Sequence, residues 1–340
     1  MMQEVARESL EQLIDLLCCP KCGEDVHAGD DDVECSTCRQ RYPVKDNIPL
    51  LFWPNEWDRS KGDVTEAMKN FYEGTPFPNY DEFDSVGTLI EKARKGIFAK
   101  SLDDQIPFGT RVLECGCGTG QLSNFLSAAN RIVIGTDLCL NSLKLAQAFK
   151  ERHHLQRAHF LQMNLFRPAL KPKSFDLVIS NGVLHHTADP FLGFQTISNL
   201  VKPNGYILIG LYHQYGRVLT DVRRILFRID RKRFEFLDSR LKDENYGEIR
   251  RNTWFADQYK NPHESKHTIS EVLGWFSKTG FEFVKSIPKA RINSRFDERE
   301  RLFQAERPGG RLELFIKELM MMFTHSKDGG LFVVIGQKKG

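Results

Sequence analysis

The sequence lacks long hydrophobic runs and carries little net charge. No apolar stretch approaches the roughly 18–20 residues of a membrane-spanning helix, so we expect no transmembrane segment. The 340 residues have a formal net charge of only +3, which gives no global basic field to attract nucleic acid or an anionic membrane. Residues 1–17 are acidic and lack the basic and apolar regions of a signal peptide. We therefore expect a cytoplasmic protein.

Cysteine is absent from most of the chain. The eight cysteines form two groups, which are Cys18, Cys19, Cys22, Cys35 and Cys38, and then Cys115, Cys117 and Cys139. A disulfide framework would spread them along the sequence. Cys19 and Cys22, with Cys35 and Cys38, make two Cys-x-x-Cys pairs, whose four thiolates can bind one structural zinc ion tetrahedrally. A redox pair and a metal site lost in evolution are the alternatives. We expect Cys18 to be a spectator.

A module of about 40 residues buries too little surface to fold unaided. Structural zinc supplies roughly 10–16 kcal/mol of apparent binding energy, which is enough to change that outcome.

The most informative stretch begins at residue 110. Residues 110–113 form a short apolar run typical of a buried parallel strand, and residues 121–129 read as a helix. Between them, Gly116, Gly118 and Gly120 alternate with other residues. Glycine suits this turn because it accepts unusual backbone angles and lets a ligand approach the main chain. The alternative is an ordinary strand-turn-helix segment in which the glycines occur by chance and bind no ligand.

An acid follows each of the first two strands. Glu114 closes the first, and Asp137 closes the strand at 132–137, where a carboxylate can accept both hydroxyls of a ribose. A dinucleotide fingerprint would need glycine where Gln121 stands. The pattern Glu-x-Gly-x-Gly-x-Gly instead resembles the first motif of the class I S-adenosylmethionine-dependent methyltransferases.

Beyond residue 110, strands and helices alternate, which predicts a doubly wound parallel sheet. We expect strands at 110–113, 132–137, 159–164, 175–180, 206–211, 281–287 and 330–336. We expect helices at 121–129, 141–153, 190–201 and 268–278, and a turn at 203–205. The fold class is then α/β, a seven-stranded, doubly wound, Rossmann-like methyltransferase sheet with one antiparallel strand and a small N-terminal zinc ribbon.

The predicted domains are a zinc ribbon at 1–53, a linker and cofactor lid at 54–109, and a methyltransferase domain at 110–340. Two insertions, 216–266 and 289–329, leave from the carboxyl ends of strands. Ligands of open α/β sheets bind at that edge, so we expect both insertions to wall the acceptor pocket.

Several segments outside the core motifs have two interpretations. Aromatic, proline-rich residues 71–80 are expected to be extended, with Tyr72, Phe77 and Tyr80 either in a cofactor lid or packing the ribbon. A helix is expected at 85–102. The methionine-rich stripe of a helix at 311–325 is expected to be core, with an adaptable ligand or partner face as the alternative.

The first 53 residues add a second resemblance. The two cysteine pairs and the segment Arg41–Leu51 resemble, over residues 10–53, the small zinc-ribbon proteins that activate tRNA, rRNA and release-factor methyltransferases. In that family the ribbon docks on a methyltransferase and stabilises it. The resemblance implies that here the ribbon is fused in cis.

The methyltransferase resemblance implies a set of cofactor contacts. Glu114 would orient the methionine amino group, Asp137 would hold the ribose hydroxyls, and Leu138 would lie against the adenine. The implied cofactor-binding residues are Glu114, Gly116, Gly118, Gly120, Asp137, Leu138, Asn164, Leu165 and Asn181. Asn164 stands where the family usually has aspartate, and its amide oxygen can accept the same hydrogen bond from the adenine amino group.

Residues 180–190 bear on the acceptor. They lack the Asn/Asp-Pro-Pro-Tyr/Phe clamp of enzymes that methylate nucleobase amines or glutamine amides. Val-Leu-His-His-Thr-x-Asp-Pro instead resembles the methyltransferases of ubiquinone and menaquinone biosynthesis, which act on small molecules. A histidine suits proton removal from a phenol or enol, so His186 and then His185 are the catalytic candidates. Either could merely pack the loop.

Three functions remain open. The first is O- or C-methylation of a small-molecule acceptor, with S-adenosylmethionine as co-substrate and zinc as a structural ion. The second is methylation of RNA or protein, with the ribbon presenting the macromolecule. The third is a cofactor-binding scaffold without catalysis, against which the intact acidic and glycine positions speak.

Overall fold

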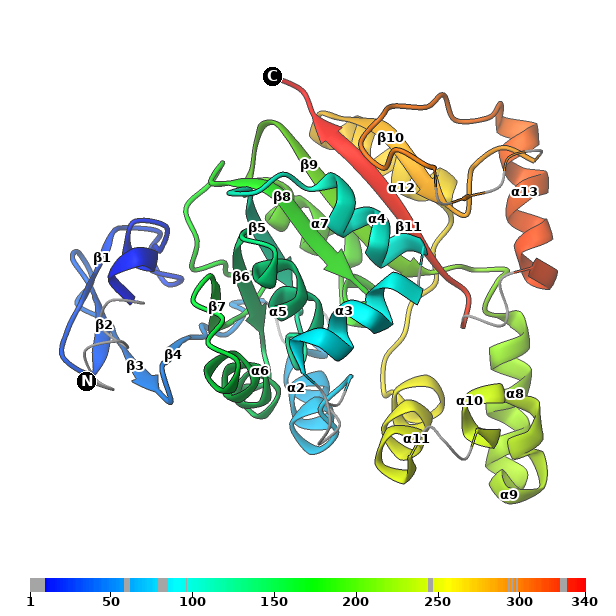
Figure 1. Cartoon of the computed structure of the whole chain (residues 1–340), viewed down its shortest axis with the longest axis horizontal. Coiled ribbons are helices and arrows are strands. Elements are labelled where there is room, and N and C mark those ends of the chain that lie inside the picture. Colours follow the sequence, from blue (N-terminus) through cyan, green and yellow to red (C-terminus); the bar gives the residue numbers. More distant parts are fainter. Residues whose placement is uncertain are drawn as a thin grey trace.

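A computed structural model of the chain describes residues 10–57, 62–78, 85–95, 97–243, 247–292, 294, 296–297, 299–324 and 329–340. One mixed sheet runs through it in the order β1-β2-β3-β4-β7-β6-β5-β8-β9-β11-β10 (Figure 1). Its strands are β1 (Val26–Ala28), β2 (Asp32–Cys35), β3 (Arg41–Lys45), β4 (Ile48–Leu51), β5 (Arg111–Cys115), β6 (Ile132–Asp137), β7 (Ala158–Met163), β8 (Phe175–Asn181), β9 (Val201–Tyr212), β10 (Phe281–Ile287) and β11 (Leu331–Lys338).

The seven strands β5 to β11 confirm the predicted methyltransferase sheet. β11 is antiparallel to both of its neighbours, β9 and β10, while the strands from β7 to β9 are parallel. The predicted turn at 203–205 was wrong, because these residues lie inside β9. The ladder between β8 and β9 shifts register there, and Asn204 has a positive φ of 61°. The turn residues thus produce a bulge rather than a strand end.

Helices cover both faces of this sheet, and further helices form the two insertions. They are α2 (Thr65–Gly74), α3 (Val86–Lys95), α4 (Ile97–Gln105), α5 (Gln121–Ala128), α6 (Leu140–Arg152), α7 (Pro190–Ser198), α8 (Val218–Ile229), α9 (Arg231–Phe234), α10 (Ser239–Lys242), α11 (Glu248–Phe255), α12 (Ile269–Thr279) and α13 (Arg311–Thr324). The predicted helix 85–102 is divided into α3 and α4, and residue 96 between them lies outside the described residues. Thr268 caps α12, its side chain accepting from the Glu271 backbone N–H.

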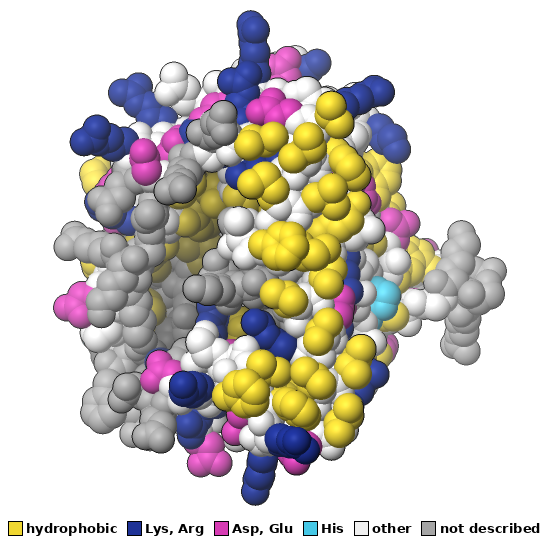
Figure 2. Space-filling model, turned by 90° about the vertical axis from the view of Figure 1, so that its right-hand side faces the viewer, with side chains coloured by type: hydrophobic (Ala, Val, Ile, Leu, Met, Phe, Trp, Pro, Cys, Tyr) yellow, Lys and Arg dark blue, Asp and Glu magenta, His cyan; other side chains and the backbone are white. Residues whose placement is uncertain are grey.

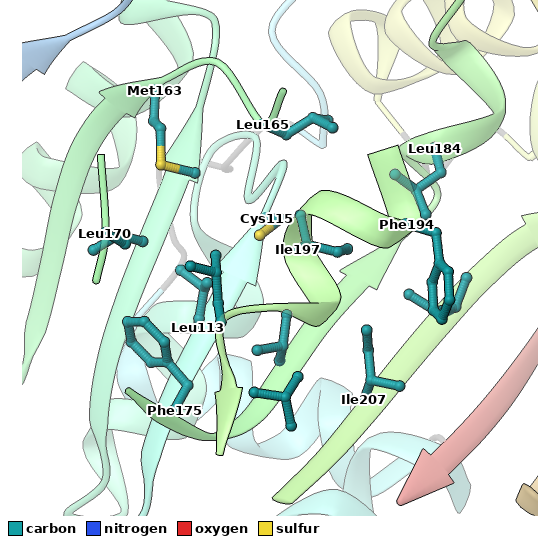
Figure 3. Close-up of a cluster of buried hydrophobic side chains, with 14 of the residues drawn as sticks. Leu113, Cys115, Met163, Leu165, Leu170, Phe175, Leu184, Phe194, Ile197 and Ile207 are labelled. Carbon is teal, nitrogen blue, oxygen red and sulfur yellow. The ribbon is translucent and has the colours of Figure 1, made fainter. Parts of the chain in front are cut away.

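Alternating residues of β5 divide the core between the two faces. Leu113 belongs to one buried cluster with Phe194 and Ile197 of α7 (Figure 3), whereas Val112 belongs to a second with Leu102 of α4 and Leu126 of α5. All six side chains are buried. Because both faces are covered, the central strands are mostly apolar, as expected for a parallel sheet with helices on both sides. This rigid sheet holds the strand ends that form the site.

The N-terminal ribbon is joined to the sheet by backbone hydrogen bonds. β4 pairs in parallel with β7, and an isolated bridge links Leu17 to Leu170. Leu17, Val33 and Leu51 belong to the same buried cluster as Leu113. The ribbon therefore covers an edge strand that would otherwise expose unpaired backbone groups.

The segment before the sheet differs from its sequence prediction. Residues 71–74 are the last turn of α2 and are not extended as predicted. Proline constrains its own residue and the one before it, and Pro76 follows the helix end at Gly74. The helix therefore continues until the prolines stop it. Tyr80 lies outside the described residues.

The two insertions present an exposed apolar face. The prediction of α13 as core was wrong for most of its stripe, because only Leu314 and Met321 are buried, whereas Phe315 is 47% and Phe323 80% exposed. On α8, Val222, Ile225 and Ile229 are exposed as well. Figure 2 shows these hydrophobic side chains gathered on one side of the molecule. No helix in the described part of the chain is long and apolar enough to cross a membrane.

Candidate active site and cysteine cluster

A cavity of about 730 Å³ lies at the carboxyl ends of β5, β6 and β8. Its volume is in the range of small-molecule sites, and its place is the edge where ligands of open α/β sheets bind. The predicted site residues that line it are Glu114, Gly116, Gly118, Asp137, Leu138, Leu165, Asn181 and His186. Gly120, Asn164 and His185 are not among the lining residues.

The glycine loop is shaped by close approaches of backbone. At Gly118, which has a φ of +53°, an added Cβ would meet the carbonyl oxygen of Phe77. The Gly118 N–H donates to Asp137 Oδ2 at 2.8 Å, and the Cys139 N–H donates to Oδ1 at 2.9 Å. The carboxylate of Asp137 is therefore fixed at the cavity wall by two backbone N–H groups.

Gly120 has a different surrounding. Its φ is +72°, and an added Cβ would lie 2.6 Å from the Ala146 Cβ and 2.8 Å from the Phe160 ring. This glycine lets α5 pack closely on the sheet. Its predicted backbone contact to a cofactor stays a prediction.

Glu114 is a buried acid facing the cavity. Ser123 Oγ donates to its Oε2, and burial raises the pKa of the Glu114 carboxyl to about 8. Burial also raises the pKa of Asp137. Two acids that resist ionisation are suited to a cationic ligand, because a positive charge would stabilise their carboxylate forms.

Asn164 ties the segment after the ribbon to the sheet. Its Nδ2 donates to the Trp53 carbonyl at 3.0 Å and to Asn55 Oδ1 at 2.8 Å, and its Oδ1 accepts from the Phe166 N–H at 3.1 Å. These bonds use the amide locally. An adenine contact of this side chain also stays a prediction.

Helix α2 lies against the sheet's helices beside the cavity. The Glu73 carboxylate accepts from the backbone N–H groups of Leu140 and Asn141, at 2.8 and 3.0 Å. These donors begin α6, where free N–H groups and the helix dipole favour a carboxylate. Tyr72 and Phe77 line the cavity as a result, which supports the lid interpretation over ribbon packing.

The two histidines form a buried pair with defined tautomers. The Tyr212 N–H donates to His185 Nδ1 at 3.3 Å, so the proton of His185 is on Nε2. That nitrogen lies 3.0 Å from His186 Nε2, which must accept, and His186 Nδ1 donates to the His263 carbonyl at 2.8 Å. Burial lowers the pKa of both rings, and that of His185 well below its usual range. Both histidines are therefore neutral at pH 7.

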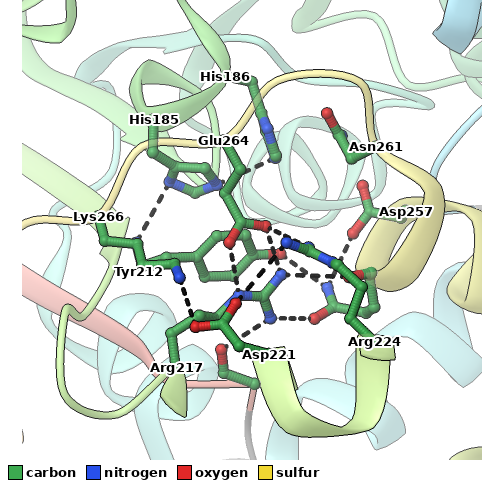
Figure 4. A network of polar contacts seen from close by, with 12 residues as sticks. His185, His186, Tyr212, Arg217, Asp221, Arg224, Asp257, Asn261, Glu264 and Lys266 are labelled. Carbon is green, nitrogen blue, oxygen red and sulfur yellow. Dashed lines mark hydrogen bonds and ion pairs between the residues drawn. The ribbon is translucent and has the colours of Figure 1, made fainter. Parts of the chain in front are cut away.

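A carboxylate that sequence reasoning missed lines the same cavity. Asp257, labelled in Figure 4, accepts at Oδ1 from the Tyr72 hydroxyl at 2.8 Å and at Oδ2 from Gln258 Nε2 at 2.9 Å. Gln258 Nε2 also donates to the Tyr212 hydroxyl at 2.7 Å. Burial raises the pKa of Tyr72 well above its usual range, so its hydroxyl stays protonated.

Next to Tyr212 and Gln258, Arg217 is completely buried. It makes a two-bond ion pair with Glu264, at 2.9 and 2.6 Å, and its guanidinium lies 3.7 Å from the Tyr212 ring centre. It also donates to Gln258 Oε1 and so orients that amide. The first insertion is thereby fixed to the end of β9.

No spacing in the sequence singled out Asp257, Gln258, Arg240 or Trp254, all of which line the cavity. The rule that ligands bind at the carboxyl edge of the sheet indicated that the segment 216–266 lines the pocket, but it did not indicate which of its residues do so.

The four predicted metal ligands come together in the ribbon. The sulfur atoms of Cys19, Cys22, Cys35 and Cys38 lie within 4.8 Å of one another. Gly23 and Arg39, each directly after a cysteine pair, have positive φ values of 83° and 58°. Both pairs therefore end in the same tight turn, and four thiolates in this arrangement fit one tetrahedral metal ion. Cys18 points elsewhere, with its sulfur 3.7 Å from the Pro168 carbonyl.

Comparison with known proteins agrees with this geometry. Residues 113–209 match the model of a methyltransferase domain family. An uncharacterized protein of Synechococcus is 29% identical over 65% of this chain and 60% of its own length. The ubiquinone biosynthesis O-methyltransferase of Haemophilus ducreyi is 31% identical over 30% of this chain and 45% of its own length. The tRNA U34 carboxymethyltransferase of Idiomarina loihiensis is 29% identical over 60% of this chain and 56% of its own length.

The chain thus spans about half the length of these curated relatives. The matched residues begin in β5 and end in β9, and so include the glycine loop and both acids. Over residues 113–209 the chain is therefore similar to methyltransferase domains, and a four-cysteine ribbon precedes this region.

Proposed function

We propose that this protein transfers a methyl group from S-adenosylmethionine to an oxygen or carbon atom of a small-molecule acceptor. The observation that carries the proposal is the cavity itself. It joins the acids Glu114 and Asp137 at one end to the hydrogen-bonded wall of Tyr72, Tyr212 and Asp257 at the other. One cavity can thus hold the donor and a small acceptor in line, which methyl transfer requires.

The cofactor would occupy the end formed by β5 and β6. Glu114 would bind the amino group of the cofactor, Asp137 its ribose hydroxyls, and Leu138 would pack against its adenine. Gly116 and Gly118 have no side chain and so would let the cofactor approach the backbone. When bound, the cofactor supplies an electrophilic methyl group. The chain's own residues orient it and exclude water.

A hydroxyl acceptor must lose a proton, and two groups are placed to help. The first is His186, as the sequence predicts. Its Nε2 lone pair, however, accepts from His185 and is already occupied. The second is Asp257, reached through the Tyr72 hydroxyl. The proton of the acceptor would pass to Tyr72 as the Tyr72 proton passes to Asp257, so we assign the base role to Asp257.

The alternative is an RNA or protein substrate, in keeping with the relative named as a tRNA carboxymethyltransferase. It would require one nucleotide or side chain to enter the cavity, with the ribbon presenting the remainder.

The experiment is to incubate purified protein and methyl-labelled S-adenosylmethionine with an extract of cells that lack this protein. The extract is then separated into small-molecule, RNA and protein fractions. We expect label in the small-molecule fraction. Label in RNA or protein would contradict the proposal and favour the alternative. The Asp137→Ala variant is the background control.

We also propose that the four-cysteine cluster binds one structural zinc ion. Metal analysis should find about one zinc per chain, lost in Cys35→Ser and kept in Cys18→Ser. The matched control works because Cys18 lies beside the cluster but points to Pro168. Because the ribbon is continuous with the sheet through β4, loss of zinc should also lower the melting temperature of the whole protein. A folded wild-type chain without metal would exclude the proposal.

A further inference from the structure

Arg240 is the single arginine or lysine among the described residues that line the cavity. The other ionisable groups of the cavity include the acids Asp137 and Asp257, and Glu114, which a cationic ligand would ionise. An anionic ligand in this cavity would be repelled by those acids and would have one cationic side chain to bind.

The guanidinium of Arg240 is held but not neutralised. It lies 3.9 Å from the centre of the Trp254 ring. Among the described residues it makes no ion pair and no side-chain hydrogen bond. By contrast, Arg217 and Arg224 of the same insertion both pair with Glu264. Stacking on an indole leaves the edge of the guanidinium, with its fork of N–H donors, free to bind.

Asp238 builds this arrangement. Its Oδ1 accepts from the Arg240 backbone N–H at 2.9 Å, and its Oδ2 accepts from Trp254 Nε1 at 3.0 Å and from the Tyr259 hydroxyl at 2.6 Å. Although burial opposes it, these hydrogen bonds lower the pKa of Asp238. The carboxylate thus binds a backbone N–H, the indole and a tyrosine hydroxyl, and among the described residues it makes no bond to the guanidinium.

The position of Arg240 indicates which ligand it serves. Arg240 and Trp254 belong to the first insertion, which also contributes Asp257 and Gln258 to the wall. The cofactor end comes instead from β5, β6 and their loops. We propose that Arg240, stacked on Trp254, binds a carboxylate or phosphate group of the methyl acceptor, so that the substrate is an anionic small molecule. This inference rests on the proposed function.

The test is calorimetry on protein saturated with S-adenosylhomocysteine. The probes are benzoate and phenyl phosphate, with benzamide as the neutral match of benzoate. The wild-type protein should bind at least one anion at least tenfold more tightly than benzamide. Arg240→Gln should weaken that binding about 10- to 100-fold, because a charge-assisted hydrogen bond is lost. Arg240→Lys should retain part of it.

Two controls show whether the loss is specific to Arg240 and to the acceptor end of the cavity. Arg228→Gln, which changes an exposed arginine of the same insertion, should leave every affinity unchanged. The affinity for S-adenosylhomocysteine should change less than twofold in Arg240→Gln. A large loss would mean that Arg240 holds the cofactor carboxylate, and would overturn the inference.

Anions that bind no better than benzamide would overturn it as well. If the wild-type protein binds no S-adenosylhomocysteine, the proposed function fails. The anion titrations of the unliganded protein then still decide whether Arg240 forms an anion subsite.

Discussion

The two ends of the cavity are built in different ways. The proposed cofactor end comes from one short piece of chain, in which Glu114 lies in β5, Gly118 follows β5, and Asp137 ends the neighbouring parallel strand β6. The acceptor end brings together Tyr72, His186, Tyr212 and Asp257 from four distant segments. The first end depends on local geometry, whereas the second depends on how an insertion folds back on the sheet.

This difference determines how each end tolerates change. The shape of the proposed cofactor end is set by backbone contacts, so a substitution there is tolerated only if the new side chain fits the space and keeps the charge. The acceptor end is fixed by side-chain hydrogen bonds and the buried Arg217–Glu264 pair. Substitutions at the two ends should therefore separate binding of the cofactor from the chemical step.

The largest expected effect is loss of cofactor binding at the first end. Gly118 has a positive φ, and the side chain of Gly118→Arg would collide with the Phe77 carbonyl oxygen. Asp137→Ala removes the proposed acceptor of the ribose hydrogen bonds. Calorimetry should detect no binding of S-adenosylmethionine to either variant, while circular dichroism stays that of the wild type. Tight binding by Asp137→Ala would move the ribose site elsewhere.

At the second end, Asp257→Asn should lower kcat about 10²- to 10⁴-fold and leave the affinity for the cofactor unchanged. The amide keeps the size of the side chain and a hydrogen bond with Tyr72 but cannot take up a proton. Single-turnover rates with the acceptor identified by labelling measure the effect. Thr253→Ser, nearby on α11, is the control. An equal loss of cofactor affinity would show that the two ends are not separable.

A smaller effect is expected at His186. Because its Nε2 already accepts from His185, His186→Gln should reduce kcat about tenfold or less through altered packing. The same single-turnover assay decides. A loss of 10²-fold or more, equal to that of Asp257→Asn, would return the base role to the histidine.

The same contrast explains what the sequence could predict. Strands β5 to β11 and the cysteine cluster were expected, because apolar runs, glycines and Cys-x-x-Cys spacing are local signals. Asp257 carries no such signal. Its role arises from contacts with Tyr72 and Gln258, and the first of these partners is far away in sequence. The pairing of β4 with β7, which joins the ribbon to the sheet, was likewise beyond the reach of periodicity.

The errors have physical causes of the same kind. Pro203 and Gly205 lie in a bulge because the residues on either side of them, Val201 and Tyr206, both pair with β8, so the strand continues across the predicted turn. The stripe of α13 was expected to be core, but periodicity shows only that a helix has an apolar face. It does not show that another element covers it.

The smallest expected effect is a change of protein stability with pH that depends on the Glu114 carboxyl. With a pKa of about 8, the Glu114 carboxyl is mostly protonated in the folded protein at pH 7, but it is ionised in the unfolded chain. The free protein should therefore lose stability as pH rises from about 4.5 to about 8, with no further loss from this group above that range. Denaturation curves across this interval measure the trend, and Glu114→Gln should flatten it.

Binding a cationic amino group beside Glu114 should favour its carboxylate and expel the proton. Calorimetry at pH 7 in two buffers of different ionisation enthalpy should then show release approaching one proton per cofactor. Glu114→Gln should abolish the release, whereas Asp257→Asn, at the other end of the cavity, should retain it. Unchanged release in Glu114→Gln would place the amino group away from this acid, and release lost in Asp257→Asn would mean that the two ends share one titrating network.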